Sequence, residues 1–184
     1  MLFNEKLAFV NSHDFLTLVA RGQHSKILLY VRICSSLTSE EECALIRRGN
    51  HEEIMAYIAH HYFYEEGLEE LIRRRKSNEV RFYFSRNYWY HFDTEADWAE
   101  IMSIPGVLED LIFSFIGKDF KTVEHKVRES FECALLKTNE HVQIRLYLSR
   151  QQLTPKAEEL LERVGSAEDK LVYFECWKAE RYFD

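Results

Sequence analysis

The stretch "RRGNHEEIMAYI", from Arg47 to Ile58, recurs in altered form as "RRRKSNEVRFYF", from Arg73 to Phe84. Each copy places at least two arginines before a turn, and an acid, an aliphatic residue and an aromatic residue follow in that order. Self-similarity at a fixed period is typical of proteins built from one repeated supersecondary unit. The sequence therefore predicts a repeat architecture, and the rest of the chain can be aligned on this phrase.

An aromatic residue marks the same place in every predicted unit. Apolar residues stand three and four positions apart around it, which is the spacing of one face of an α-helix. The aromatic residues of this row are Tyr30, Tyr57, Tyr83, Phe115, Tyr147 and either Tyr173 or Phe174. Because such a row faces the apolar side of each helix, we interpret it as core packing, although stacking on nucleic-acid bases is the alternative function of an aromatic row.

A shorter apolar-periodic stretch precedes each of these helices and predicts a first helix in every unit. Glycine or asparagine follows it at Gly22, Gly49, Asn139 and Gly165, where we expect the left-handed backbone that ends many helices. Helix starts are predicted where an N-cap acceptor precedes an acid by three residues. These pairs are Ser39 with Glu42, Asn50 with Glu53, Thr94 with Asp97, and Ser166 with Asp169, and Thr154 precedes a first-turn proline, Pro155.

The predicted fold is all-α: about twelve helices in six hairpins, stacked as a short α-solenoid with repeats of roughly 26–32 residues. One domain, residues 1–184, is expected. Its predicted repeats span roughly 11–36, 37–63, 64–92, 93–120, 121–152 and 153–184. With two prolines and six glycines, the chain has too few turn residues for a sandwich or barrel of many short strands.

In architecture the chain resembles bacterial helical-hairpin repeat proteins of HEAT-like or ankyrin-like character, and the resemblance covers nearly the whole chain. The ankyrin signature "TPLHxA" is absent, and the period is shorter than that of HEAT repeats. What the resemblance implies is a protein that acts as a binding surface.

Composition narrows the class of protein. The chain has 46% hydrophobic residues and a net charge of -7, which favour a globular core and argue against a surface that binds nucleic acid over its whole extent. Its four cysteines form no CxxC pair, and no signal peptide or membrane-length apolar run is evident. We therefore expect a cytoplasmic protein with reduced cysteines.

Cations recur at the ends of the predicted helices, for example at Arg21, Arg48 and Arg163, where they favour the partial negative charge of a helix C-terminus. The third repeat carries more of them: from Arg73 to Arg86 the net charge is +5, and aromatic residues follow directly. We predict a partner-binding surface formed by Arg73, Arg74, Arg75, Lys76, Arg81, Arg86, Tyr88, Trp89 and Tyr90.

The predicted function is a non-enzymatic protein–protein interaction module whose partner presents an acidic face. Three alternatives stay open: nucleic-acid binding by the same basic stretch, a small inhibitor of an enzyme, and a basic stretch that is only a solvated turn. We expect neither catalysis nor a metal or other cofactor. The segment "HEEIM" at 51–55 ends in Met55 where a zinc-protease motif needs a second histidine, and His61 with Glu65 makes too small a ligand set.

Overall fold

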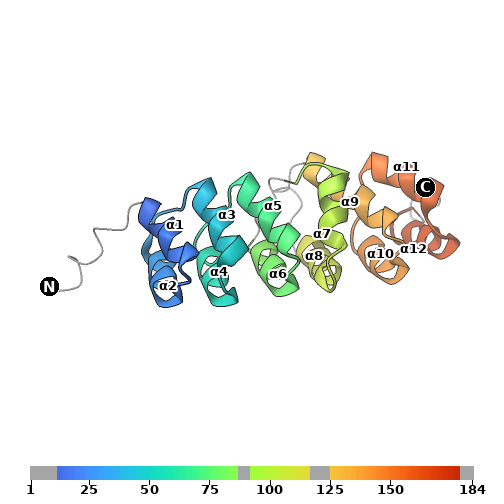
Figure 1. Cartoon of the computed structure of the whole chain (residues 1–184). Coiled ribbons are helices and arrows are strands. Elements are labelled where there is room, and N and C mark those ends of the chain that lie inside the picture. The colour runs from blue at the N-terminus through green and yellow to red at the C-terminus, as the bar shows by residue number, and fades with distance from the viewer. Residues whose placement is uncertain (1–11, 87–91, 117–124, 179–184) are drawn as a thin grey trace. The chain divides into compact units, whose positions relative to one another are not determined.

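The computed structural model describes residues 12–86, 92–116 and 125–178, and these residues form twelve α-helices and no β-strand (Figure 1). The all-α prediction is confirmed for this part of the chain. The helices are α1 (Ser12–Ala20), α2 (His24–Ile33), α3 (Ser39–Arg48), α4 (His51–Ile58), α5 (Glu65–Arg74), α6 (Ser77–Ser85), α7 (Glu95–Met102), α8 (Val107–Ile116), α9 (His125–Lys137), α10 (His141–Leu148), α11 (Pro155–Val164) and α12 (Ala167–Trp177). None of them has both the length and the apolar character needed to cross a membrane.

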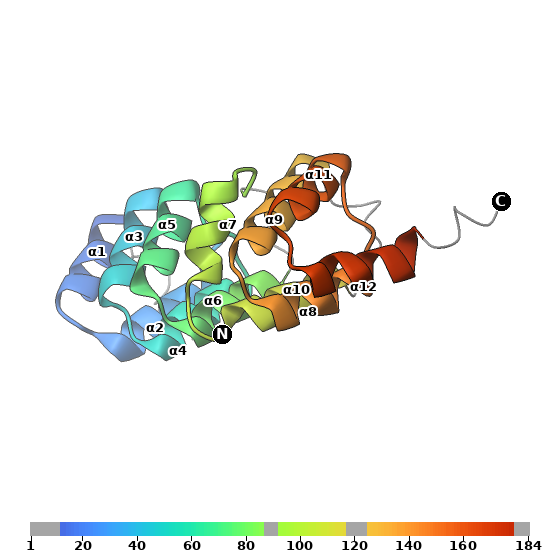
Figure 2. The same cartoon turned by 90° about the vertical axis from the view of Figure 1, so that its right-hand side faces the viewer.

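The chain divides into two compact units, Met1–Arg86 and Asn87–Asp184. In the first unit α1, α3 and α5 pack side by side in one layer, and α2, α4 and α6 pack in a second layer (Figure 2). In the second unit α7, α9 and α11 form one layer, and α8, α10 and α12 form the other. Each unit thus contains three helical hairpins, with one helix of every hairpin in each layer. A single domain spanning both units stays a prediction.

The predicted row of aromatic residues lies in the interior of the two units. Tyr57, Tyr83 and Tyr147 are fully buried, whereas Tyr30 is only partly buried. In the first unit, Phe63 lies between Tyr57 and Tyr83, with ring centroids 5.4 Å from each. These contacts support the interpretation of the row as core packing.

Aromatic rings also pack against one another in the second unit, and two of them lie closer together than those of the first unit. Phe115 stacks on Phe131 with 3.8 Å between ring centroids, and Phe131 lies 5.6 Å from Tyr147. Apolar aromatic surface is therefore continuous from α8 through α9 to α10, which buries area and fixes the spacing of these helices.

Three of the five predicted caps are present. Asn50 and Ser166 form capping boxes with Glu53 and Asp169, and Thr94 accepts from Asp97 N–H. Pro155 opens α11, but the hydroxyl of Thr154 donates to Glu132 and does not cap the helix. At α3, however, the cap is Thr38 with Glu41, so the predicted pair Ser39 and Glu42 is wrong by one residue. Both pairs satisfy the local pattern, and Glu42 instead accepts a hydrogen bond from a tyrosine of the following helix.

The glycine predictions are correct at one turn and wrong at two. Gly22 has the left-handed backbone (φ 61°), as does Asn139 (φ 59°). Gly49 and Gly165 are extended, with φ of -67° and -65°. They are needed for space, since a Cβ atom at Gly165 would lie 2.6 Å from the carbonyl oxygen of Leu161.

Candidate functional site

A hydrogen-bonded network joins a tyrosine and a glutamate inside the second hairpin. Tyr57 Oη donates to Oε1 of Glu42 over 2.7 Å and accepts the N–H of Leu37 at 3.2 Å. The other carboxylate oxygen of Glu42 accepts the N–H of Tyr64 at 2.7 Å. Because Leu37 precedes this hairpin and Tyr64 begins the next one, the network ties the hairpin to its neighbours on both sides.

The same network recurs in the fifth hairpin. Tyr147 Oη donates to Glu132 over 2.9 Å, and Glu132 accepts the N–H of Thr154 at 2.8 Å. Donor and acceptor are 15 residues apart in the first contact and 22 in the second, as they are around Glu42. The repetition shows that the pattern belongs to the repeat and not to one location.

A third copy lies in the sixth hairpin. Tyr173 Oη donates to Glu158, 15 residues earlier, and accepts the N–H of Leu153 at 3.2 Å. The second carboxylate oxygen of Glu158 accepts from the Lys178 ammonium at 2.9 Å, where Glu42 and Glu132 accept a backbone N–H.

Burial dominates the ionisation of this network. Desolvation raises the pKa of Glu42 to about 7, although the hydrogen bonds from Tyr57 and Tyr64 act in the opposite direction. Desolvation, followed by the bond to Glu42, raises the pKa of Tyr57 well above its usual value. All of these groups are directed at one another and are enclosed by the hairpins, so we assign them a structural role.

Histidine–carboxylate pairs connect successive second-layer helices at their N-termini. His24 Nδ1 lies 3.0 Å from Glu53, His51 Nδ1 lies 3.0 Å from Glu79, and His141 Nδ1 lies 2.7 Å from Asp169. Each histidine is the first residue of its helix, and each acid is the third residue of the helix that follows in the same layer. The acids are at most 1% exposed, so each imidazole adds a partner to a buried carboxylate that also contacts Asn50, Arg74 or Ser166.

Asp169 shows the electrostatic balance in such a pair. Burial opposes its ionisation, but hydrogen bonds from Ser166 and His141 together hold the pKa of Asp169 below its usual value. The carboxylate therefore stays charged inside the fold, at the N-terminus of α12, where a negative charge is favourable.

The histidine considered as a metal ligand occupies a different environment. His61 stacks on the ring of Tyr57, with 4.6 Å between ring centroids, and burial followed by the charge of His60 lowers the pKa of His61. Across residues 12–86, 92–116 and 125–178, no group of three or more histidine, cysteine, aspartate or glutamate side chains could hold a metal ion.

The predicted basic surface divides into two kinds of residue. Arg73 forms ion pairs with Glu69 and Glu70, and Arg74 donates to Ile46 O at 2.7 Å and lies 3.0 Å from Glu79. Arg86 donates to Ala59 O at 2.8 Å. Arg74 and Arg86 thus bind carbonyl groups at the C-terminal ends of helices in the preceding hairpin. They do not bind the carbonyl groups of the helices to which they belong.

The remaining cations of that surface are exposed. Arg75 and Lys76 form the turn between α5 and α6, Arg81 lies on α6, and all three are exposed. Arg75 has a left-handed backbone with φ of 54°. That conformation is uncommon for a residue with a side chain. Tyr88, Trp89 and Tyr90 lie outside the described residues, so the aromatic half of the predicted surface stays a prediction.

Charge is distributed unequally between the two units. Residues 1–86 contain 12 lysines and arginines and 12 acids, whereas residues 87–184 contain 12 and 19. The second unit therefore carries the whole net charge of -7, while the first unit is neutral around its basic turn. The sequence contained this asymmetry, but the boundary at Arg86 was needed to recognise it.

Comparison with known proteins finds no relative: no protein-family model, no curated protein and no solved structure matches the chain.

Proposed function

We propose that this protein is a non-enzymatic α-solenoid module that binds an acidic segment of a partner protein at the turn between its fifth and sixth helices. The contact surface consists of Arg75, Lys76 and Arg81, with Tyr88, Trp89 and Tyr90 as its predicted aromatic part. The observation that carries the proposal is the conformation of Arg75. Its left-handed backbone (φ 54°) is the conformation that Gly22 and Asn139 adopt in the turns of the first and fifth hairpins, where the residue is glycine or asparagine.

A left-handed conformation costs a non-glycine residue roughly 1–2 kcal/mol. Glycine or asparagine would occupy this position with less strain, so an exposed arginine here disfavours the fold locally. Strained residues of this kind concentrate at functional sites, where the side chain contacts a ligand or a partner. Three exposed cations on one hairpin supply the charge that an acidic partner recognises.

The internal ion pairs favour a protein partner over nucleic acid. Glu69 and Glu70 neutralise Arg73, and Glu79 neutralises Arg74, so part of the basic stretch is already compensated. Binding to a phosphate backbone draws its affinity from many simultaneous cation contacts. A short acidic segment with aromatic residues needs fewer charges and also uses the neighbouring tyrosines and tryptophan.

The test uses charge reversal at exposed residues only. Arg75→Glu/Lys76→Glu should weaken the binding of a fluorescein-labelled peptide of glutamates and tryptophans by about tenfold, measured by fluorescence anisotropy. Arg21→Glu/Arg48→Glu is the matched control, because both arginines are exposed and lie at the ends or turns of other first-layer helices. Arg74 is left unchanged because its hydrogen bond to Ile46 supports the fold.

Three results would contradict the proposal. One is the absence of peptide binding at low salt, and another is an equal loss of affinity in the control variant. The third is tighter binding to a single-stranded oligonucleotide of equal charge with a steep dependence on salt, which would favour the nucleic-acid alternative.

A further inference from the structure

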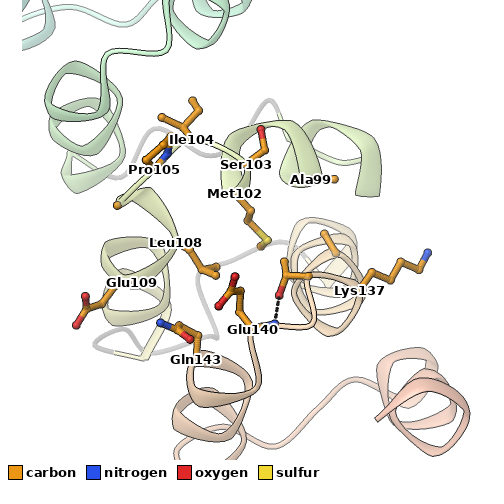
Figure 3. A pocket seen from close by; sticks show the side chains of 13 residues that line it. Ala99, Met102, Ser103, Ile104, Pro105, Leu108, Glu109, Lys137, Glu140 and Gln143 are labelled. Carbon is orange, nitrogen blue, oxygen red and sulfur yellow. Dashed lines mark hydrogen bonds between the residues drawn. The ribbon is translucent and has the colours of Figure 1, made fainter. Parts of the chain in front are cut away.

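A pocket of about 600 Å³ opens in the second unit, beside the turns that join α7 to α8 and α9 to α10 (Figure 3). Its floor is apolar and is formed by Met102, Ile104, Leu108 and Ala134, each at most 9% exposed. Carboxylates stand at its edge. Polar and apolar groups contribute about equally to the lining of the pocket, and a concave site of this size can enclose a small ligand or a side chain.

The pocket occurs where the regular pattern of the hairpins is interrupted. The turn between α7 and α8 has four residues, 103–106, whereas the equivalent turns of the second and sixth hairpins have two. The third residue of α10 is Gln143, in place of the acid found at this position in α4, α6 and α12. Since α8 begins with Val107 and not with histidine, no histidine–carboxylate pair bridges the described residues of α8 and α10, and space remains between the turns.

The electrostatics of the pocket favour a cation. Figure 3 shows the Glu140 side chain directed toward Met102 and Leu108, and Glu109 lies at the edge. Neither carboxylate makes a hydrogen bond or ion pair with another described residue of the chain, whereas Lys137, the one lysine of the lining, is bound to Glu95. The whole unit carries a net charge of -7, which adds to the attraction.

We propose that this pocket binds the side chain of a lysine or arginine that a partner peptide presents. The aliphatic stem contacts Met102 and Leu108, and the cationic end lies at the carboxylate of Glu140. The volume exceeds that of one side chain, so residues flanking the cation also fit. This site is independent of the basic turn in the first unit, and its partner has the opposite charge.

Methionine NMR can test the proposal directly, because the chain has only three methionines. With methionine labelled at the ¹³C methyl group, Met102 reports on the pocket, and Met55, which lies on α4 of the first unit, is an internal control. Nα-acetyl-lysine methylamide should shift the Met102 signal in a saturable manner and leave Met55 unmoved. Nα-acetyl-norleucine methylamide, which has the stem without the charge, should bind at least about threefold more weakly.

Two variants separate the effect of the Glu140 charge from that of the apolar cavity. Glu140→Gln should raise the dissociation constant of the lysine probe about two- to fivefold, which is the range expected for a solvent-exposed ion pair. Glu100→Gln is the matched control, since Glu100 is exposed on α7 but does not line the pocket. Met55 should keep its chemical shift in both variants, which verifies that the first unit is unaffected.

The proposal is overturned if the lysine probe leaves Met102 unmoved, if norleucine binds equally well, or if Glu140→Gln and Glu100→Gln behave alike. It is also overturned if n-butylamine binds more tightly than the lysine amide, because the ligand would then be a small free amine and not a peptide side chain.

Discussion

The hydroxyl group of Tyr57 donates a hydrogen bond to Glu42 inside the second hairpin, and both side chains are completely buried. A buried carboxylate is unfavourable unless its oxygens accept hydrogen bonds, and a buried hydroxyl likewise needs partners. The pair satisfies both groups and also satisfies backbone N–H groups of the preceding loop and of the next hairpin. Since the pair recurs as Tyr147 with Glu132, we regard it as the polar contact that fixes one hairpin against the next.

Removal of the hydroxyl should destabilise the first unit. Tyr57→Phe leaves Glu42 and the N–H of Leu37 each short of one partner, and an unsatisfied buried group costs about 1–3 kcal/mol. The free energy of unfolding from urea titration should fall by this amount. Tyr64→Phe removes a hydroxyl from an exposed neighbouring residue and should change the free energy by less than about 0.5 kcal/mol. Equal effects of the two variants would refute the assigned role of Tyr57.

The raised pKa of Glu42 predicts a dependence of stability on pH. In the unfolded chain this carboxyl group loses its proton near its ordinary pKa, whereas in the folded chain it holds the proton until about pH 7. Stability is therefore lost as the pH rises from about 4.5 to about 7. Glu42→Gln lacks the titrating group, so its urea midpoint should decline less over this range than that of the wild type. Parallel pH profiles would contradict the prediction.

The contribution of Asp169 to the dependence of stability on pH should have the opposite sign. Its pKa is depressed in the folded state, so its contribution to stability is present above the ordinary aspartate pKa and is lost as the pH falls through the folded value. Asp169→Asn weakens the cap and removes the charge beside His141. The free energy of unfolding at neutral pH should fall by roughly 1–2 kcal/mol as a result. Acid unfolding followed by circular dichroism should then be less steep in the variant, and an unchanged acid profile would argue against the His141 contact.

The extended turn glycine should tolerate no side chain. In Gly165→Ala the new methyl group would lie 2.6 Å from the carbonyl oxygen of Leu161, within backbone that cannot move without breaking α11. We expect a loss of more than about 2 kcal/mol. Gly106→Ala in the same unit places its methyl group in open space and introduces only the left-handed strain, roughly 1–2 kcal/mol. Thermal unfolding ranks the two, and a larger loss at Gly106 would contradict the steric explanation.

The helices could be predicted from the sequence because apolar spacing and caps act over a few residues. The contacts between hairpins could not, because they depend on residues 20 to 29 positions apart that meet only after folding. Glu42 illustrates the limit: it fits a capping box with Ser39 as well as Glu41 does with Thr38, but in the fold it accepts hydrogen bonds from Tyr57 and Tyr64. Arg74 likewise fits the rule for cations at helix C-termini, yet the carbonyl that it binds belongs to Ile46 of another helix.

Local sequence patterns indicate the pocket even less clearly than the contacts between hairpins. Pro105 is compatible with the start of a helix, but α8 begins at Val107, and Pro105 and Gly106 instead lengthen the turn that borders the pocket. The substitution of Gln143 for an acid becomes informative only when it is compared with Glu53, Glu79 and Asp169 at the same helix position.

Lys178 has a consequence for any attempt to lengthen this array by protein engineering. Its ammonium group occupies the carboxylate oxygen of Glu158 that, at Glu42 and Glu132, receives the first amide of the following hairpin. A grafted seventh hairpin would compete with this lysine for a single acceptor. Extension of the hairpin pattern after Trp177 in an engineered chain would therefore require the replacement of Lys178, which would release this oxygen of Glu158 for a backbone amide.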